Sequence, residues 1–269
     1  VLVLAGSPGK TGAAAMTATA AMRAGAGLVT LAVPRGIEPV VASRTLEVMT
    51  ATLPETDGGG LGEAALDAIL RLLEDKRCLA LGPGMGQSED AESLISNLLA
   101  QCHLPIVIDA DGLNNIADQA DQLRLCKAPV VITPHPGEMA RLVGTSVKTV
   151  QNNRIGCARE FSRAFKTHVV LKGAGTVIAH PDGFVFTNNT GNSGMASGGM
   201  GDVLTGLIAE LKLLQRETQS NAQIVSLSKY WGKSVGNIQR LNIKFCRHRQ
   251  GHFSLQEVGW RRGIGHRDH

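Results

Sequence analysis

Short apolar runs alternate with longer segments of helical periodicity along most of the chain. Each run is bounded by glycine, proline or polar residues, which is typical of strands buried on both faces of a parallel sheet. Strands are expected at residues 1–5, 28–33, 78–81, 106–109, 130–133, 169–172 and 176–179. This alternation predicts an α/β protein in which helices cover a mostly parallel sheet.

Between the runs, apolar residues recur at the spacing of one helix face, and alanine adds helix propensity. Helices are expected at residues 13–24, 62–73, 91–100, 137–143 and 150–165. The last two predicted strands are joined by a short glycine-containing link, and a turn then leads to a further apolar run at residues 184–187. Strands that follow one another so closely pair in the antiparallel manner, so we expect a mixed sheet.

Ligands of open α/β sheets bind beyond the carboxyl ends of the strands, so the loops after the apolar runs are candidate site residues. After the first run, a Gly-Lys-Thr sequence at residues 9–11 precedes a predicted helix, as in a P-loop. A P-loop also needs a glycine five positions before that triplet's glycine, where this chain has Leu4. We therefore interpret residues 6–12 as a tight turn facing a ligand.

Carboxylates and a histidine follow two other predicted strands. Asp109 and Asp111 end one run, and carboxylates at such a place can bind Mg²⁺ through water or orient a substrate hydroxyl. The alternative is that Asp109 satisfies backbone donors and Asp111 caps the next helix, and the sequence leaves both interpretations open. His135 lies between two prolines after another run, which favours a ligand-facing position over a structural one.

The segment 191–211 is a glycine-rich loop, GNSGMASGGMGD, that leads into an apolar helix. Its glycines let backbone N–H groups turn toward a ligand, and the helix N-terminus adds positive charge, which together suit a phosphate group. Asp202 stands at the junction, where a carboxylate repels anions. It is therefore either a proton acceptor or metal partner, or only the N-cap of the helix.

Composition narrows the class of protein. The 269 residues are 43% hydrophobic, which can bury a sizeable core, but no segment reaches the roughly 18 apolar residues of a membrane span. The 5 cysteines are widely separated, so neither a disulfide scaffold nor a paired-cysteine metal site is indicated. We expect a cytoplasmic protein that opens with a strand, the start of which is missing, and not with a signal peptide.

Charge is distributed unevenly. Residues 1–211 carry 16 Lys and Arg against 20 Asp and Glu, whereas residues 212–269 carry 11 against 3. A basic tail by itself can indicate nucleic-acid or membrane-surface binding. This tail also holds both tryptophans and the only tyrosine, and its periodicity is poor, so the composition changes abruptly where it begins.

Taken in order, the loop sequences resemble one family. They read VLVLAGSPGKTGAA, LGPGMG, VIDADGLN, TPHPGEMARL, LKGAGTVI and GMASGGMGDVLTGLIA. This series is similar to the ADP- or ATP-dependent NAD(P)H-hydrate dehydratases of the ribokinase-like superfamily. GGMGD and LKGAGT alone would indicate only a ribokinase-like nucleotide site, and the other motifs are more specific. The resemblance implies a three-layer α/β/α sandwich with a mostly parallel central sheet.

The resemblance also implies a reaction, the dehydration of the S epimer of hydrated NADH or NADPH. The nucleotide would phosphorylate the hydroxyl of the hydrate, and elimination of phosphate would then regenerate NAD(P)H, with AMP or ADP as the other product. Asp202 would accept the hydroxyl proton, while the glycine loop stabilises charge on the phosphoryl group. Such an enzyme is a carbon-oxygen lyase of metabolite repair.

The matching motifs imply the remaining site residues. Substrate would be bound, together with Asp202, by Ala13, Ala14, Gly84, Gly86, His135 and Glu138. Nucleotide would be bound by Lys172, Gly173, Ala174, Gly175, Thr176, Gly199 and Gly201. Mg²⁺ is implied as a cofactor without named protein ligands, although Asp109, Asp111 and Asn114 could order the ion or the substrate from a distance.

Partners and organisation are implied in the same way. Hydrated NAD(P)H and an adenine nucleotide are the expected partners, neither a membrane nor a nucleic acid is expected, and the analogy predicts a homotetramer. Many relatives carry an N-terminal epimerase domain that we do not find in this sequence, and we expect that upstream sequence is missing.

Two regions are expected, a dehydratase domain at residues 1–212 and a basic tail at residues 213–269 in which nothing of the family is recognisable. A shifted reading frame, foreign coding sequence after a truncated gene, or a divergent tail would each produce this pattern, and we rank the first two above the third. The sequence leaves open whether the tail folds or is disordered.

Two other functions compete with the dehydratase. A ribokinase-like kinase of a small molecule such as a vitamin precursor would share the fold and GGMGD but release a stable phosphate ester. A non-catalytic basic protein would use the tail to bind nucleic acid.

Overall fold

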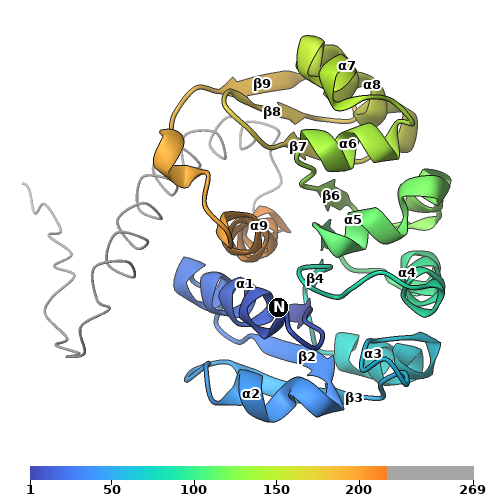
Figure 1. Ribbon diagram of the computed structural model, residues 1–269, viewed down its shortest axis with the longest axis vertical. Helices are drawn as coiled ribbons and strands as arrows, with labels where there is room; N and C mark the ends of the chain where they lie inside the picture. Colours follow the sequence, from blue (N-terminus) through green and yellow to red (C-terminus); the bar gives the residue numbers. More distant parts are fainter. Residues whose placement is uncertain (217–269) are drawn as a thin grey trace, which may run out of the picture.

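The structure is a computed structural model, and it describes residues 1–216. Within these residues nine strands form one sheet in the order β3-β2-β1-β4-β5-β6-β7-β8-β9 (Figure 1). The strands are β1 (Leu2–Leu4), β2 (Thr30–Pro34), β3 (Met49–Leu53), β4 (Leu79–Leu81), β5 (Ile106–Ile108), β6 (Val130–Ile132), β7 (His168–Leu171), β8 (Thr176–Ala179) and β9 (Val185–Asn188). Every strand predicted from an apolar run is present, so the α/β class is confirmed.

Neighbouring strands from β3 to β7 are parallel, and β8 and β9 continue the sheet in antiparallel pairs. The predicted mixed sheet is therefore confirmed. Side chains alternate between two cores because successive residues of a strand face opposite sides. In β1, for example, Leu2 and Leu4 pack in one core and Val3 packs in the other.

One strand was not predicted. Met49–Leu53 forms β3 at the edge of the sheet, where it pairs only with β2. Most of its residues are partly or fully exposed, and its sequence, MTATL, contains two threonines. A strand with one free edge does not need the continuous apolar run of a central strand, so no such run marks β3 in the sequence.

The α-helices of the described chain are α1 (Thr11–Ala24), α2 (Glu38–Ala42), α3 (Leu66–Leu73), α4 (Glu89–Gln101), α5 (Asp111–Asn115), α6 (Pro136–Leu142), α7 (Val147–Asn152), α8 (Arg154–Phe165) and α9 (Met200–Arg216). Helices α1, α2 and α9 share a core with one face of the sheet, and α3 to α8 pack on the other face (Figure 1). The predicted three-layer sandwich is confirmed. None of these helices is long and apolar enough to cross a bilayer.

The predicted helix at residues 150–165 is instead two helices. The backbone leaves helical geometry at Asn153, where φ is −140°, and the Asn153 side chain accepts a hydrogen bond from Gly156 N at 3.1 Å. Asparagine competes well for backbone donors and is a favoured N-cap. The chain therefore ends α7 at Asn152 and starts α8 at Arg154, although the apolar spacing continues through both.

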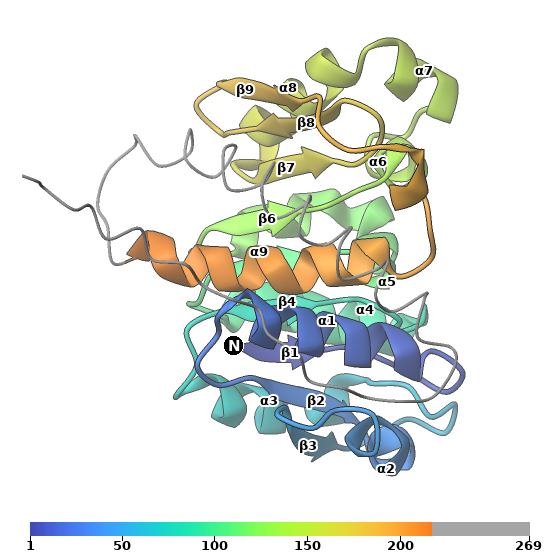
Figure 2. The ribbon, with the colours of Figure 1, turned by 90° about the vertical axis from the view of Figure 1, so that its left-hand side faces the viewer.

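Helices α1 and α9 lie side by side over the sheet (Figure 2). Their backbones approach closely at Gly206, where a Cβ would stand only 2.1 Å from the carbonyl oxygen of Thr17. Only glycine permits this approach. The first turn of α9 thereby lies at the edge of the sheet where the predicted site residues gather, with Gly201 beside Asp109 and Lys172.

Candidate active site

Two ion pairs join the loops that follow three strands, β1, β5 and β7, at the carboxyl edge of the sheet. Lys172, directly after β7, contacts Asp109, directly after β5, with 2.5 Å between Nζ and Oδ1. Lys10, after β1, contacts Asp111, with 2.8 Å between Nζ and Oδ2. Residues far apart in sequence thus meet where the strand order of an open sheet places a ligand.

Asp109 is the most buried charge of this group, with 1% of the residue exposed. Its Oδ1 accepts from the Lys172 ammonium, and its Oδ2 accepts a hydrogen bond from the hydroxyl of Thr205 in α9 at 2.9 Å. A buried carboxylate is tolerated only with such partners. The partners of the carboxylate are side chains of other elements, so the alternative in which Asp109 only satisfies nearby backbone donors is not supported.

Asp202 lies in the first turn of α9, two positions after Met200, where the helix begins. It is inside the helix and does not occupy the N-cap position. Gly201 beside it packs over the Lys172 and Asp109 pair, since a Cβ at Gly201 would stand 3.3 Å from Asp109 Oδ2 and 3.4 Å from Lys172 Nζ. The helix therefore presents its N-terminal turn to the charges at the end of β5 and β7.

The surroundings of Asp202 raise the pKa of its carboxyl to about 6. Burial is the main cause, and repulsion from Asp109 and more weakly from Asp111 adds to it, while the Lys172 ammonium opposes the shift. A carboxylate with a pKa near 6 is largely ionised at neutral pH and still has appreciable affinity for a proton. These are the properties of a general base.

Asp111 fixes the LGPGMG loop instead of capping its own helix. It accepts hydrogen bonds from Gly86 N at 2.9 Å and from the Gln87 side chain at 3.3 Å, in addition to the Lys10 ammonium. Burial alone would raise the pKa of Asp111, but these donors together lower it below its usual value. Asn115 also holds the loop, because its amide donates to Gly86 O at 2.9 Å.

The first loop and the LGPGMG loop touch at Gly84. This residue has a φ of +65°, and a Cβ there would lie 3.0 Å from the Cβ atoms of both Ala13 and Lys10. Ala13 is half-buried, whereas Ala14 is fully buried against the core. Both alanines predicted to bind substrate lie in the first turn of α1, and Ala13 is the one that a ligand can reach.

His135 and Glu138 form the N-terminal cap of α6. The His135 ring accepts hydrogen bonds at Nδ1 from Gly137 N (3.0 Å) and Glu138 N (3.2 Å), and His135 N donates to Glu138 Oε2 at 2.7 Å. An Nδ1 that accepts carries no proton, so Nε2 bears the hydrogen and faces Glu138 Oε1 at 3.2 Å. The His135 side chain is still 49% exposed, which leaves its ring accessible.

Glu138 joins this cap to the charged centre, because its Oε2 lies 3.6 Å from Lys172 Nζ. One lysine therefore serves two nearly buried carboxylates, Asp109 and Glu138. Sequence reasoning named all three residues but did not predict that they meet.

The predicted nucleotide residues after Lys172 form the exposed turn between β7 and β8. Gly173 and Ala174 are exposed, Gly175 and Thr176 are half-buried, and the Thr176 hydroxyl donates to Gly173 O at 2.9 Å.

Arg154, which we did not predict, anchors the end of β7 by donating from Nη2 to Leu171 O (2.9 Å) and Lys172 O (3.1 Å).

On the opposite side of this edge, the glycine loop before α9 is largely exposed. Gly199 has a φ of +88° and approaches α1, where a Cβ would lie 2.5 Å from the sulfur of Met16. The loop thus remains accessible to a ligand, while Gly199 and Gly201 pack closely against their neighbours.

The carboxylates of the site could contribute to a Mg²⁺ site that a bound nucleotide completes. Among residues 1–216 no cluster of three or more His, Cys, Asp or Glu could enclose a metal ion. Mg²⁺ in nucleotide sites commonly takes only one or two carboxylates and completes its shell with phosphate oxygens and water. Asp109 and Glu138, which already share one cation, provide such a pair.

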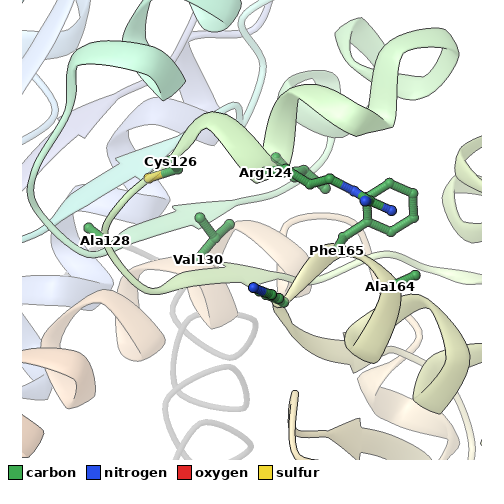
Figure 3. Close-up of a pocket in the computed structure, with 8 residues that line it drawn as sticks. Arg124, Cys126, Ala128, Val130, Ala164 and Phe165 are labelled. Carbon is green, nitrogen blue, oxygen red and sulfur yellow. The ribbon is translucent and has the colours of Figure 1, made fainter.

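A separate pocket of about 180 Å³ lies away from this site (Figure 3). It is bounded by the start of β6 at Val130 and the end of α8 at Phe165, hence at the opposite ends of the strands. The Arg124 guanidinium lies over the Phe165 ring, 5.1 Å from its centre, and also pairs with Asp121. None of the predicted site residues lines this pocket.

Known proteins are similar to this chain in sequence and in fold. Residues 1–236 match the family model described as NAD(P)H-hydrate dehydratase, whereas the family motifs quoted above end by residue 212. The bifunctional NAD(P)H-hydrate repair enzyme Nnr of Moorella thermoacetica is 50% identical over 211 residues, which are 78% of this chain and 40% of that protein. The chain thus spans about 40% of the length of the curated relative it matches here.

Two solved structures are similar over 78% of this chain. The ADP/ATP-dependent NAD(P)H-hydrate dehydratase from Bacillus subtilis, crystallised with ATP and Mg²⁺, is 32% identical with a TM-score of 0.63 over 70% of its chain. A ribokinase-like superfamily protein from Enterococcus faecalis is 26% identical with a TM-score of 0.65 over 69% of its chain. The fold is therefore ribokinase-like, and the chain belongs to the NAD(P)H-hydrate dehydratase family.

Proposed function

We propose that this chain dehydrates the S epimer of hydrated NADH or NADPH, with ADP or ATP as the phosphoryl donor. One observation carries the proposal. Asp202, a carboxyl with its pKa raised to about 6, stands in the first turn of α9 beside the Lys172 ammonium, so that a proton acceptor and a phosphate-binding cation face the same space. Family membership supplies the reaction for which such a pair is suited.

The first step of the proposed reaction is phosphoryl transfer. Asp202 takes the proton of the hydrate hydroxyl, the hydroxyl oxygen bonds to the terminal phosphorus of the nucleotide, and the bond from that phosphorus to the rest of the nucleotide breaks. AMP leaves from ADP, or ADP leaves from ATP. Lys172 and the N–H groups at the start of α9 stabilise the negative charge on the transferred group.

The second step is elimination. The lone pair of the ring nitrogen expels phosphate from the adjacent carbon, and loss of a proton from the neighbouring carbon restores the ring double bond. Phosphorylation matters because phosphate leaves far more readily than hydroxide. In this step the protein has to hold the ring and exclude water, which suits the close contacts among Ala13, Gly84 and Lys10.

We assign the substrate to the side formed by Ala13, Gly84, Gly86 and His135, and the nucleotide to residues 172–176 with Gly199 and Gly201. Asp202 and Lys172 lie between these sides. Ala14 is fully buried and would act only through the loop that it supports. Glu138 orients the His135 ring and would hold, with Asp109, the Mg²⁺ that neutralises the nucleotide phosphates.

The test is to incubate the protein with Mg²⁺, hydrated NADH and either ADP or ATP, and to follow the absorbance of NADH while measuring released phosphate. We expect absorbance and phosphate to rise together. Phosphorylation of a vitamin precursor without any gain of NADH absorbance would instead identify a small-molecule kinase.

We further propose a homotetramer in the cytoplasm, with residues 1–212 as the catalytic domain and residues 213–269 as a separate region. Almost all of residues 213–269 lies outside the described residues, and the family match reaches residue 236, so the boundary at 212 rests on composition, while the homotetramer and the location rest on family analogy. Light scattering measures the oligomeric state.

Equal, weak binding of DNA by the full chain and by a chain ending at residue 214 would confirm that nucleic acid is not a partner.

A further inference from the structure

A fully buried threonine connects the two halves of the site. Thr205 is 0% exposed, and its hydroxyl lies 2.9 Å from Asp109 Oδ2 and 3.1 Å from the carbonyl oxygen of Gly201. A hydroxyl has a single proton to donate. Thr205 thus shares that proton between a carboxylate at the end of β5 and a carbonyl in the first turn of α9.

A helical threonine commonly donates to the carbonyl of the residue four positions before it, and Thr205 keeps that contact with Gly201. It has a second acceptor in Asp109, which is nearer and, being charged, stronger, so the hydroxyl also links its helix to the sheet. The result is a continuous chain of contacts from Lys172 through Asp109 to Thr205.

Thr205 also has the right position to control Asp202. Residues three and four apart lie on one helix face, so Thr205 stands one turn below both Asp202 and Gly201. The glycine loop before α9 is largely exposed, although Gly201 in the first turn packs over the Asp109 and Lys172 pair. Farther along, Gly206 is held against α1. Between these two regions, the Thr205 hydroxyl makes a polar contact that ties the first turn to the sheet.

We propose that Thr205 is a positioning residue for Asp202, because its hydroxyl fastens the first turn of α9 to the Asp109 and Lys172 pair. This inference rests on the proposed function for its catalytic consequence. The mechanical part, the contribution of the Thr205 hydroxyl to holding the first turn, can be measured without turnover. A displacement of about 1 Å at a reacting group lowers the rate about a hundredfold, so loss of the hydroxyl should act on kcat.

The test compares Thr205→Val, which keeps the volume and removes the hydroxyl, with Thr205→Ser, which keeps the hydroxyl. Thr45→Val is the matched control, since Thr45 is also buried and donates to the carbonyl four residues before it, in the segment after α2. Thr205→Ala is a second hydroxyl-free variant in case valine does not fit. All are measured by steady-state kinetics and by hydrogen exchange of the amides of residues 203–206.

We expect Thr205→Val to lower kcat about tenfold to a hundredfold with less than about a threefold change in KM for the nucleotide. Its amides at residues 203–206 should exchange about tenfold faster than in the wild type, as a loss of local protection requires. Thr205→Ser and Thr45→Val should resemble the wild type in both measurements.

Unchanged exchange and unchanged kcat in both hydroxyl-free variants would overturn the inference while leaving the dehydratase in place. A rise in KM equal to the fall in kcat/KM, with kcat constant, would also overturn it, because that pattern indicates lost binding. If the wild type shows no turnover but exchange still quickens in Thr205→Val, the proposed function fails and the fastening of the first turn is supported.

Discussion

The Lys172 ammonium lies 2.5 Å from the Asp109 carboxylate, in a pair that brings together the ends of β7 and β5. Sequence motifs assign Lys172 to a nucleotide site, but the structure shows that the same lysine also neutralises a buried charge. The nucleotide-binding role proposed for Lys172 is therefore coupled to a structural role. This coupling explains why the edge of the sheet can gather three acidic side chains, Asp109, Glu138 and Asp202, around one cation.

Removing the lysine charge is expected to destabilise the fold as well as the site. Lys172→Met leaves Asp109 buried without its cation, and breaking such a pair costs about 3–5 kcal/mol. The free energy of unfolding in urea should fall by that order. The double variant Lys172→Met with Asp109→Asn should recover part of the loss, since the buried charge is then gone. Equal stability of the wild type and Lys172→Met would contradict the coupling.

The raised pKa of Asp202 predicts the pH dependence of turnover. Below a pH of about 6 the carboxyl is protonated and cannot accept a proton from the hydrate, so kcat/KM, which reports the free enzyme, should decline on the acidic side with a midpoint near 6. The measurement is a pH profile of kcat/KM for the hydrate between about 3.5 and 8.5. A rate that stays level down to the ordinary aspartate range, about pH 4, would show that Asp202 is not the titrating base.

The same shift has a consequence for stability. Because the pKa of Asp202 is higher in the folded state than the value of 3.8 for an unperturbed aspartate, folding favours the protonated form. The stabilising contribution is complete below pH 3.8 and is lost as the pH rises through about 6. Asp202→Asn should therefore unfold at higher urea concentration than the wild type at pH 8, by about 1–2 kcal/mol after allowance for solvent screening. Near pH 3.8 the difference should vanish.

Two glycines of the neighbouring helices should respond oppositely to alanine. A Cβ at Gly206 would stand 2.1 Å from Thr17 O, so Gly206→Ala must push α9 away from α1 and should cost about 1–3 kcal/mol. Gly12, in the first turn of α1, has nothing within 4 Å of a Cβ. Gly12→Ala should stabilise by up to about 1 kcal/mol through helix propensity. Thermal unfolding measures both, and a stable Gly206→Ala would refute the close helix contact.

Metal removal provides a further test. Since no cluster of described residues encloses an ion, Mg²⁺ should be held mainly by the nucleotide and be lost readily to a chelator. Excess EDTA should abolish turnover, added Mg²⁺ should restore it, and the melting temperature of the protein without nucleotide should not change. A large fall in that melting temperature on chelation would indicate a structural metal instead.

Much of the fold was predictable because the central strands are buried on both faces and so read as apolar runs. The failures have local causes. The edge strand β3 does not need a continuous apolar run, because it is not buried on both faces. Asn153 interrupts a helical pattern by capping a new helix, and this effect of one side chain does not show in the apolar periodicity.

Individual candidate residues of the site could be named from the sequence, but the contacts among them could not be predicted. Glycine and proline at strand ends marked Asp202 and His135 as candidates, whereas Lys172 became a candidate through the resemblance of its motif to the family. Thr205 and Arg154 were missed because nothing in their local sequence distinguishes them from ordinary helical residues. Each of them matters because it contacts the end of a strand elsewhere in the sequence, Thr205 after β5 and Arg154 at the end of β7.

The central claim is that Asp202 is the base of a nucleotide-dependent dehydration. The most direct measurement compares the wild type with Asp202→Asn, recording both the affinity for ADP or ATP by calorimetry and the rate of NADH formation from the hydrate. The account predicts that Asp202→Asn binds nucleotide at least as tightly, since a repelling charge is removed, and loses at least about a hundredfold in kcat. Turnover of Asp202→Asn at the wild-type rate would contradict it.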